Sequence, residues 1–202
     1  MTIEIQSDHL PTDFLKNLRT QTSPYHAKLE EAGLSSRLMD PGLTIETYKS
    51  ILIAFYGFII PAEKHYYVNS LTIFPRLALY KRGGLLMQDL LFLGLSETDL
   101  KNLPQFKVTP FQNESAILGC LYVLEGSKLG GQMISRHVTN KLKFINEEGT
   151  KFFSAHGAET GRYWKEFIDI LCRYALDTKQ EEMIIEGAKQ TFSEFGKWLK
   201  TT

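Results

Sequence analysis

Three glycines interrupt the segment Leu124–Gln132, whose apolar residues otherwise recur at helical spacing. They are Gly126, Gly130 and Gly131, and each costs a helix roughly 1 kcal/mol relative to alanine. Such a run is expected where a helix bends or where another group approaches its backbone closely. Gly126 and Gly130 are four residues apart and share one helix face, which would be bare and suited to a planar ligand. The same spacing also suits close packing against another helix, so the spacing alone leaves both interpretations open.

A second candidate for chemistry is the pair His26 and Glu30, which are four residues apart and share a helix face. An imidazole in this setting can bind a metal while a neighbouring carboxylate orients the ring. A single histidine is more often structural, so the pair is only a candidate. The other histidines have no HExxH or comparable zinc spacing, so a zinc site made by protein ligands alone is not expected. They are His9, His65, His137 and His156.

Several basic residues lie where they could meet an anionic ligand: Arg19, Lys128, Arg136, Arg162 and Lys165. Arg19 precedes His26 by seven residues, about two helical turns along the same side. Solvated helix faces explain most such charges. The chain has no GxSxG elbow, no P-loop and no dinucleotide-binding GxGxxG. Gly83 and Gly84 follow two basic residues, but no strand precedes them, so a phosphate loop is not expected.

The elements that must position these residues are helices, because apolar residues recur with helical periodicity and no hairpin signals occur. We expect an all-α fold of about seven or eight helices. The expected helical segments are Thr12–Ala32, Thr44–Asn69, Gly84–Leu93, a short turn from Ser96, a long run from Asn113 or Ser115 to Leu142, Glu159–Ala175 and Lys179–Leu199. Pro24 makes the first segment either one kinked helix or two pieces, and Pro61 is expected to kink the second.

Composition indicates one globular domain over residues 1–202, with 1–10 as a flexible N-terminus. The chain is 43% hydrophobic, enough for a core with a ligand pocket, and its 23 basic and 23 acidic residues balance. This balance gives no indication of a nucleic-acid or membrane-surface partner. The N-terminus lacks the apolar run of a signal peptide, and the apolar stretch Ile51–Ala62 is too short to span a bilayer. Cys120 and Cys172 fit buried thiols, so a cytoplasmic protein is expected.

The motifs together resemble bacterial haem oxygenases. The similarity is carried by Leu18-Arg19-x-x-Thr22-x-x-x-His26-x-x-Leu29-Glu30 and by Leu121-Tyr122-Val123-Leu124-Glu125-Gly126-Ser127-x-Leu129-Gly130-Gly131-Gln132. Supporting matches are Phe55-Tyr56-Gly57-Phe58-x-x-Pro61-x-Glu63, Asp89-Leu90-x-x-Leu93-Gly94 and Arg162-x-Trp164-x-x-Phe167. The similarity runs in order from about Leu10 to Leu199. Each motif is weak by itself, but the pair at this separation is specific.

The resemblance implies a role for each site residue. His26 would bind haem iron, with Glu30 orienting it. Gly126, Ser127, Gly130 and Gly131 would form the catalytic face of a kinked distal helix. The remaining cofactor-binding residues would be Arg19, Lys165 and Arg136 near the haem propionates or edge, together with Tyr122 and Phe192. Animal-type members have an aspartate where this chain has Ser127, which can hold water but carries no charge.

The resemblance also implies the reaction: haem, both cofactor and substrate, would be opened by O2 to biliverdin with release of CO and iron. Electrons would come from a ferredoxin or a flavoprotein reductase, since the chain has no flavin or nicotinamide motif. Two alternatives stay open. One is a haem-binding sensor or carrier without oxygenase activity, which the departure at Ser127 permits. The other is a helical enzyme acting on a small cofactor such as a thiamin fragment, with Cys120 or Glu125 performing the chemistry.

Overall fold

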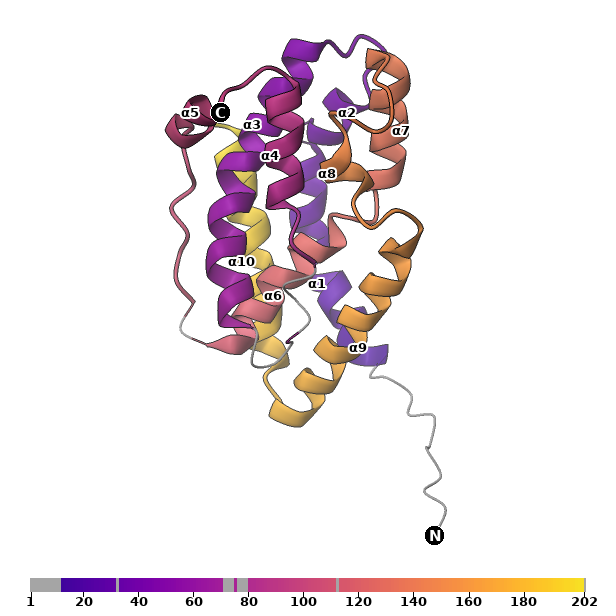
Figure 1. Ribbon diagram of the computed structural model, residues 1–202. Coiled ribbons are helices and arrows are strands. Elements are labelled where there is room, and N and C mark those ends of the chain that lie inside the picture. Colours follow the sequence, from indigo (N-terminus) through magenta and orange to yellow (C-terminus); the bar gives the residue numbers. More distant parts are fainter. Residues whose placement is uncertain (1–11, 32, 71–74, 76–79, 112, 202) are drawn as a thin grey trace.

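A computed structural model describes residues 12–31, 33–70, 75, 80–111 and 113–201. The described part contains helices and no strand, as the sequence predicts (Figure 1). The longer helices are α1 (Thr12–Glu31), α3 (Ile45–Ala62), α4 (Gly83–Phe92), α6 (Glu114–Gly126), α7 (Gly131–Leu142), α9 (Thr160–Thr178) and α10 (Glu181–Leu199). The expected flexible terminus, residues 1–10, lies outside the described residues.

The two prolines inside helices have different local outcomes. α1 continues through Pro24 as one helix, which decides between the two alternatives that the sequence left open. Thr44 is the N-cap of α3, and its side chain accepts a hydrogen bond from the Thr47 amide. Just after Pro61 the helix widens into a π-helical turn, η1 (Glu63–Tyr67). A proline removes one helical hydrogen bond, so a change of winding beside it is expected.

The short helices were only partly predictable. α5 (Glu97–Asn102) is the turn expected from Ser96, and Ser96 and Asp99 cap it reciprocally. α2 (Leu34–Leu38) and α8 (Lys151–Ser154) were not expected. A helix of four or five residues is too short to display a hydrophobic period, so the sequence gives little sign of either.

The centre of the fold is the packing of α6 against α10, the most extensive helix contact in the described residues. Two glycines permit the close approach. A Cβ atom at Gly119 would lie 2.0 Å from the Ile184 carbonyl oxygen, and one at Gly187 would lie 2.1 Å from the Ala116 carbonyl oxygen. These distances are far inside van der Waals contact, so both positions require glycine. Further along α10, the Phe195 ring packs against Phe55 and Phe58 of α3.

α3 and η1 form one continuous helical run alongside α10 (Figure 1). Residues 45–67 are long and apolar enough to cross a membrane by length and composition alone, and 56% of their most apolar stretch is buried in the fold. Tyr48, Leu52 and Phe58 on this run are at most 1% exposed. The indole N–H of Trp198, near the end of α10, donates to the Ala54 carbonyl oxygen at 2.8 Å. The run therefore packs as a core helix.

Candidate active site

A cavity of about 360 Å³ lies where helices from both ends of the chain meet the α6–α7 junction. Its walls come from α1, α2, α3, α6, α7, α8, α9 and α10, with Arg82 and the turn that links α6 to α7. The lining is mainly aliphatic and aromatic. Eight of the residues predicted for the site line it: Arg19, His26, Glu30, Tyr122, Gly126, Ser127, Gly130 and Phe192.

His26 lies on α1 in the cavity wall. Its side chain is 60% exposed, because the cavity is open to solvent. The Phe192 ring meets the imidazole edge-on, with centroids 5.7 Å apart. Glu30 Oε1 lies 4.0 Å from His26 Nε2, which is too long for a hydrogen bond. Within the described residues the ring nitrogens make no hydrogen bond, so the imidazole is available to a ligand.

The α6–α7 junction is the kink that the glycine run predicts. α6 ends at Gly126 and α7 begins at Gly131. The amides of Lys128, Leu129 and Gly131 bond to carbonyl oxygens three residues earlier, at 3.0–3.1 Å. This tighter pattern, in place of the four-residue spacing of an α-helix, bends the chain between the two helices.

The three glycines of the kink have different surroundings. A Cβ atom at Gly130 would meet nothing within 4 Å, and one at Gly126 would lie 3.5 Å from the Trp164 ring in ordinary contact. A Cβ atom at Gly131 would lie 2.2 Å from the Phe153 carbonyl oxygen. Gly130 and Gly126 line the cavity, whereas Gly131 does not and is required by packing. Both interpretations of the glycine run therefore apply, each at different positions.

Ser127 is held by Arg82, a residue that the sequence motifs did not single out. The Ser127 hydroxyl accepts from Arg82 Nη2 at 2.8 Å and donates to the Leu124 carbonyl oxygen at 2.7 Å. Arg82 is 3% exposed, and its guanidinium lies 4.3 Å from the centre of the Phe152 ring. Burial lowers the pKa of Arg82, and Tyr67, Glu125 and Glu63 oppose that effect. No local signal distinguishes this arginine from the exposed Lys81 beside it.

The Glu63 carboxylate holds the backbone at Arg82 and Gly83 in place. It accepts from the Arg82 amide at 2.6 Å and from the Gly83 amide at 3.0 Å, at the start of α4. Burial raises the pKa of Glu63, and these two amide hydrogen bonds oppose the rise. The carboxylate thereby connects η1 to α4 and supports the only arginine in the described residues that reaches Ser127.

Arg19 and Tyr122 both line the cavity, from α1 and α6 respectively. Burial raises the pKa of Tyr122, and the Arg19 guanidinium and the Thr22 hydroxyl oppose the rise. The Tyr122 ring lies against Trp164, with centroids 5.6 Å apart. A cation beside a phenol offers two hydrogen-bond donors to an acidic ligand.

The other predicted basic residues lie outside the cavity wall. Arg136 and Lys165 are exposed, and Arg162 pairs on the surface with Glu159. Lys128 is buried and pairs with Glu125 at 2.6 Å. Among the described residues these side chains do not line the cavity, so ligand contacts by Arg136 and Lys165 stay predictions.

The lining suits a flat, mainly apolar ligand with acidic substituents and a metal at its centre. Ligand cavities are mostly apolar, with a few placed polar groups. Here those groups are an imidazole able to bind a metal, an arginine with a tyrosine, and a serine held by an arginine. Gly130 leaves a bare stretch of backbone at the cavity. An iron porphyrin has the matching chemistry.

The sequence profile of the "Heme oxygenase" family matches residues 12–201. Heme oxygenase PigA of Pseudomonas aeruginosa is 26% identical over an alignment of 201 positions, which covers 95% of this chain and 96% of that protein. A heme oxygenase from Neisseria meningitidis, solved with NO and CO bound, is 25% identical with a TM-score of 0.75, covering 93% of this chain and 90% of its own.

Two further solved structures share the fold at lower identity. The Leptospira interrogans heme oxygenase has a TM-score of 0.78 and 20% identity, covering 94% of this chain and 99% of its own. Heme oxygenase-1 of the cyanobacterium Synechocystis, in complex with heme, has a TM-score of 0.74 and 18% identity. The match covers 93% of this chain and 91% of that one. The profile match over nearly the whole chain identifies this protein as a member of the haem oxygenase family.

Proposed function

We propose that this protein opens haem to biliverdin with O2, releasing CO and iron, and that haem is both its cofactor and its substrate. The observation that carries the proposal is one cavity lined by both an imidazole able to bind a metal, that of His26, and the bare backbone at Gly130. Family membership supports the same reaction.

Binding and orientation of haem follow from the cavity wall. A ring nitrogen of His26 would bind the iron, Phe192 limits rotation of the imidazole by its edge contact, and the Glu30 carboxylate lies 4.0 Å from the ring, where it helps to orient the imidazole. Arg19 and Tyr122 bind a haem carboxylate. Lys165 and Arg136 contribute only where the bound ligand extends beyond the cavity. When bound, haem supplies the iron that takes up O2 and the ring that is oxidised.

Ser127 and Arg82 supply the polar groups beside Gly130. The Ser127 hydroxyl is oriented by its two hydrogen bonds and retains an oxygen lone pair that can hold a water molecule. The Arg82 guanidinium places a fixed positive charge behind that hydroxyl. Ser127 itself stands at the position where the resemblance implies an aspartate in animal-type relatives. A preorganised cation stabilises negative charge that develops during a reaction. Water held by the Ser127 hydroxyl would be the group that supplies protons at this face of the cavity.

The electrons for the reaction must come from another protein. We propose a ferredoxin or a flavoprotein reductase as a transient partner, a cytoplasmic location, and no nucleic-acid or membrane partner. The equal numbers of acidic and basic residues support the last point, that no nucleic acid or membrane surface is a partner.

The thiamin-type alternative is not supported by the geometry. The Cys120 thiol is fully buried, and burial raises its pKa to about 12, so it is a poor nucleophile. Glu125 is occupied by its bonds to Lys128 and Tyr67. Neither side chain lines the cavity.

The test is a comparison of His26→Ala with the wild type and with His137→Ala, which changes a histidine outside the cavity wall. We expect the wild type and His137→Ala to form bilin from haem, reductant and O2. His26→Ala should lose the histidine-type haem spectrum and turnover, and added imidazole should restore part of both. An unchanged haem spectrum in His26→Ala would refute the assignment, and a stable oxy complex of the wild type would favour the carrier alternative.

A further inference from the structure

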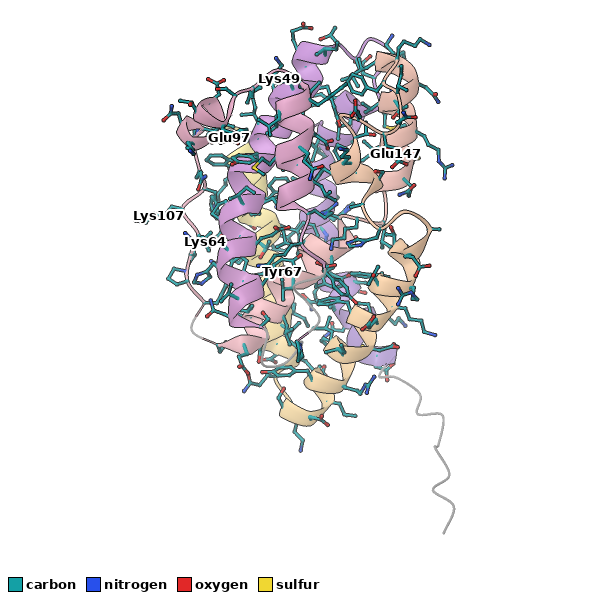
Figure 2. The ribbon with its side chains drawn as sticks, in the orientation of Figure 1. Lys49, Lys64, Tyr67, Glu97, Lys107 and Glu147 are labelled. Carbon is teal, nitrogen blue, oxygen red and sulfur yellow. The ribbon has the colours of Figure 1, made fainter. Side chains whose placement is uncertain are left out.

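A cluster of buried charges lies behind the kink, outside the cavity. Lys128 and Glu125 are 5% and 2% exposed, and Lys128 Nζ lies 2.6 Å from Glu125 Oε2. The same ammonium donates to the Tyr80 carbonyl oxygen at 2.5 Å. The other Glu125 oxygen accepts from the Tyr67 hydroxyl on η1. Figure 2 labels Tyr67, whose side chain lies in the interior of the bundle.

A buried ammonium is expensive, because it loses its hydration and regains only what its partners supply. Burial and, to a lesser degree, the charge of Arg82 lower the pKa of Lys128, and Glu125 and Glu63 oppose the fall; the resulting pKa is about 8. Lys128 lies in the turn of the kink, where a side chain on the surface would avoid this cost. Its burial therefore indicates that the ammonium has a specific structural role.

The contacts of Lys128 and Arg82 identify that role. Lys128 connects the kink to the backbone of Tyr80, and Arg82 connects the same segment to Ser127 and to the Leu124 carbonyl oxygen. Two cations thus join residues 80–82 to residues 124–128. Within the kink, the amides of Lys128, Leu129 and Gly131 make three-residue backbone bonds, and the Ser127 amide keeps a four-residue bond to Val123. The side-chain contacts of Lys128 and Arg82 add hydrogen bonds from the kink to a separate segment of the chain.

We propose that Lys128 is a positioning residue, whose ammonium fixes the kink to Glu125 and Tyr80 and thereby sets the backbone of Gly126–Gly130 at the cavity. The proposal rests on the proposed function, in which this backbone meets haem. Lys128 does not touch the ligand, and its effect passes through the kink.

The proposal predicts a dependence on pH, because the ammonium loses its proton in the alkaline range. Loss of the charge leaves the Glu125 carboxylate without its partner and weakens the attachment of the kink. The titratable or charged groups facing Lys128 are Glu125 on α6, Glu63 and Tyr67 on η1, Arg82 and Tyr80 before α4, and His156 before α9. Lys128 lies in the kink itself, and its pKa is lowered to about 8.

The first test uses the haem-free protein and the variants Lys128→Met and Lys141→Met. Lys141 is an exposed lysine near the end of α7 and serves as the matched control. Backbone amide chemical shifts of Gly126, Ser127 and Gly130 are followed by NMR from pH 6.5 to pH 9.5. We expect a common midpoint close to 8 in the wild type and in Lys141→Met, and none in Lys128→Met. The same titration in Lys128→Met, or no titration in the wild type, overturns the proposal.

The second test uses the haem-loaded protein as its ferrous CO complex, which has no ionisable iron ligand. The C–O stretching frequency reports the electrostatic environment of the cavity at the kink. We expect it to shift with pH over the same range in the wild type and to be constant in Lys128→Met. A pH-dependent frequency that survives in Lys128→Met contradicts the proposal.

A double variant keeps the proposal testable if Lys128→Met alone does not fold. Removing one partner of a buried pair leaves the other charge uncompensated, whereas replacing both is far less costly. Glu125→Gln with Lys128→Met keeps an acceptor for Tyr67 and should be folded and free of the pH transition. If the wild type forms no bilin, the proposed function fails while the amide titration still decides the role of Lys128. If bilin forms but the amide titration is unaffected by the variants, the role of Lys128 alone fails.

Discussion

Gly130 and Gly131 are adjacent and chemically identical, yet the structure predicts opposite outcomes for their substitution. A Cβ atom at Gly130 enters open space, and the backbone there has φ −81°, which alanine adopts readily. Gly130→Ala should therefore keep or raise stability, by up to about 1 kcal/mol, through the reduced entropy of the unfolded chain. A Cβ atom at Gly131 would lie 2.2 Å from the Phe153 carbonyl oxygen, so α8 must move. Gly131→Ala should lose about 1–3 kcal/mol, or roughly 2–12 °C in Tm for a chain of this size.

Haem binding should show the reverse order. Gly130→Leu places a branched side chain in a cavity of about 360 Å³ and should weaken haem binding by at least about tenfold, or about 1.4 kcal/mol. Its circular dichroism should stay helical. Gly131→Ala, measured well below its Tm, should bind haem nearly as the wild type does. Urea unfolding of the haem-free proteins and titration with haem at the Soret band measure the two effects. Equal stability of the two alanine variants, or normal haem binding by Gly130→Leu, would refute the reasoning.

Three further predictions follow from buried groups. Asp89 accepts from the Lys151 and Phe152 amides, and burial raises its pKa from 3.8 to about 6. The folded chain thus holds this proton more tightly, so the stability that Asp89 contributes is present below pH ~4 and is lost as pH rises through ~6, by about 3 kcal/mol. Asp89→Asn should remove this part of the pH dependence of urea unfolding, and identical curves for both proteins would contradict it. Gly119→Ala should lower the Tm by several degrees, since its Cβ meets the Ile184 carbonyl oxygen; an unchanged Tm would show that α6 and α10 can separate freely. Arg82→Lys should slow bilin formation more than it weakens haem binding, because lysine lacks the fork that holds Ser127; equal losses in both would assign Arg82 to binding.

Much of the fold was predictable because it depends on helical periodicity. α9 and α10 bury one long face each, whereas α3 is buried nearly all round. The ends of α9, of α10 and of α3 taken together with η1 agree with the expected ends within a few residues. The kink was also predictable, since three glycines within six residues strongly disfavour a straight, continuous helix. α2 and α8 were not, because four or five residues carry no period.

The site was predictable where a residue has an unusual type at an unusual spacing, as with His26, Glu30 and the glycines. Arg82 was not predictable, because its importance comes from tertiary burial against Phe152 and Ser127, 45 residues or more away along the chain. Lys128 was expected to be a candidate for an anionic ligand, and the structure pairs it with Glu125 inside the protein. Whether a cation meets a ligand or a buried carboxylate depends on packing between elements, which the local sequence does not record.

The measurement that tests the central claim most directly is the fate of haem in the wild-type protein. The complex is given a reductant and O2, and bilin, CO and iron are quantified against the haem consumed. The account predicts that the Soret band is replaced by a bilin band, with CO and iron released in equal amounts to the haem lost. A long-lived oxy complex that releases neither CO nor iron would contradict it.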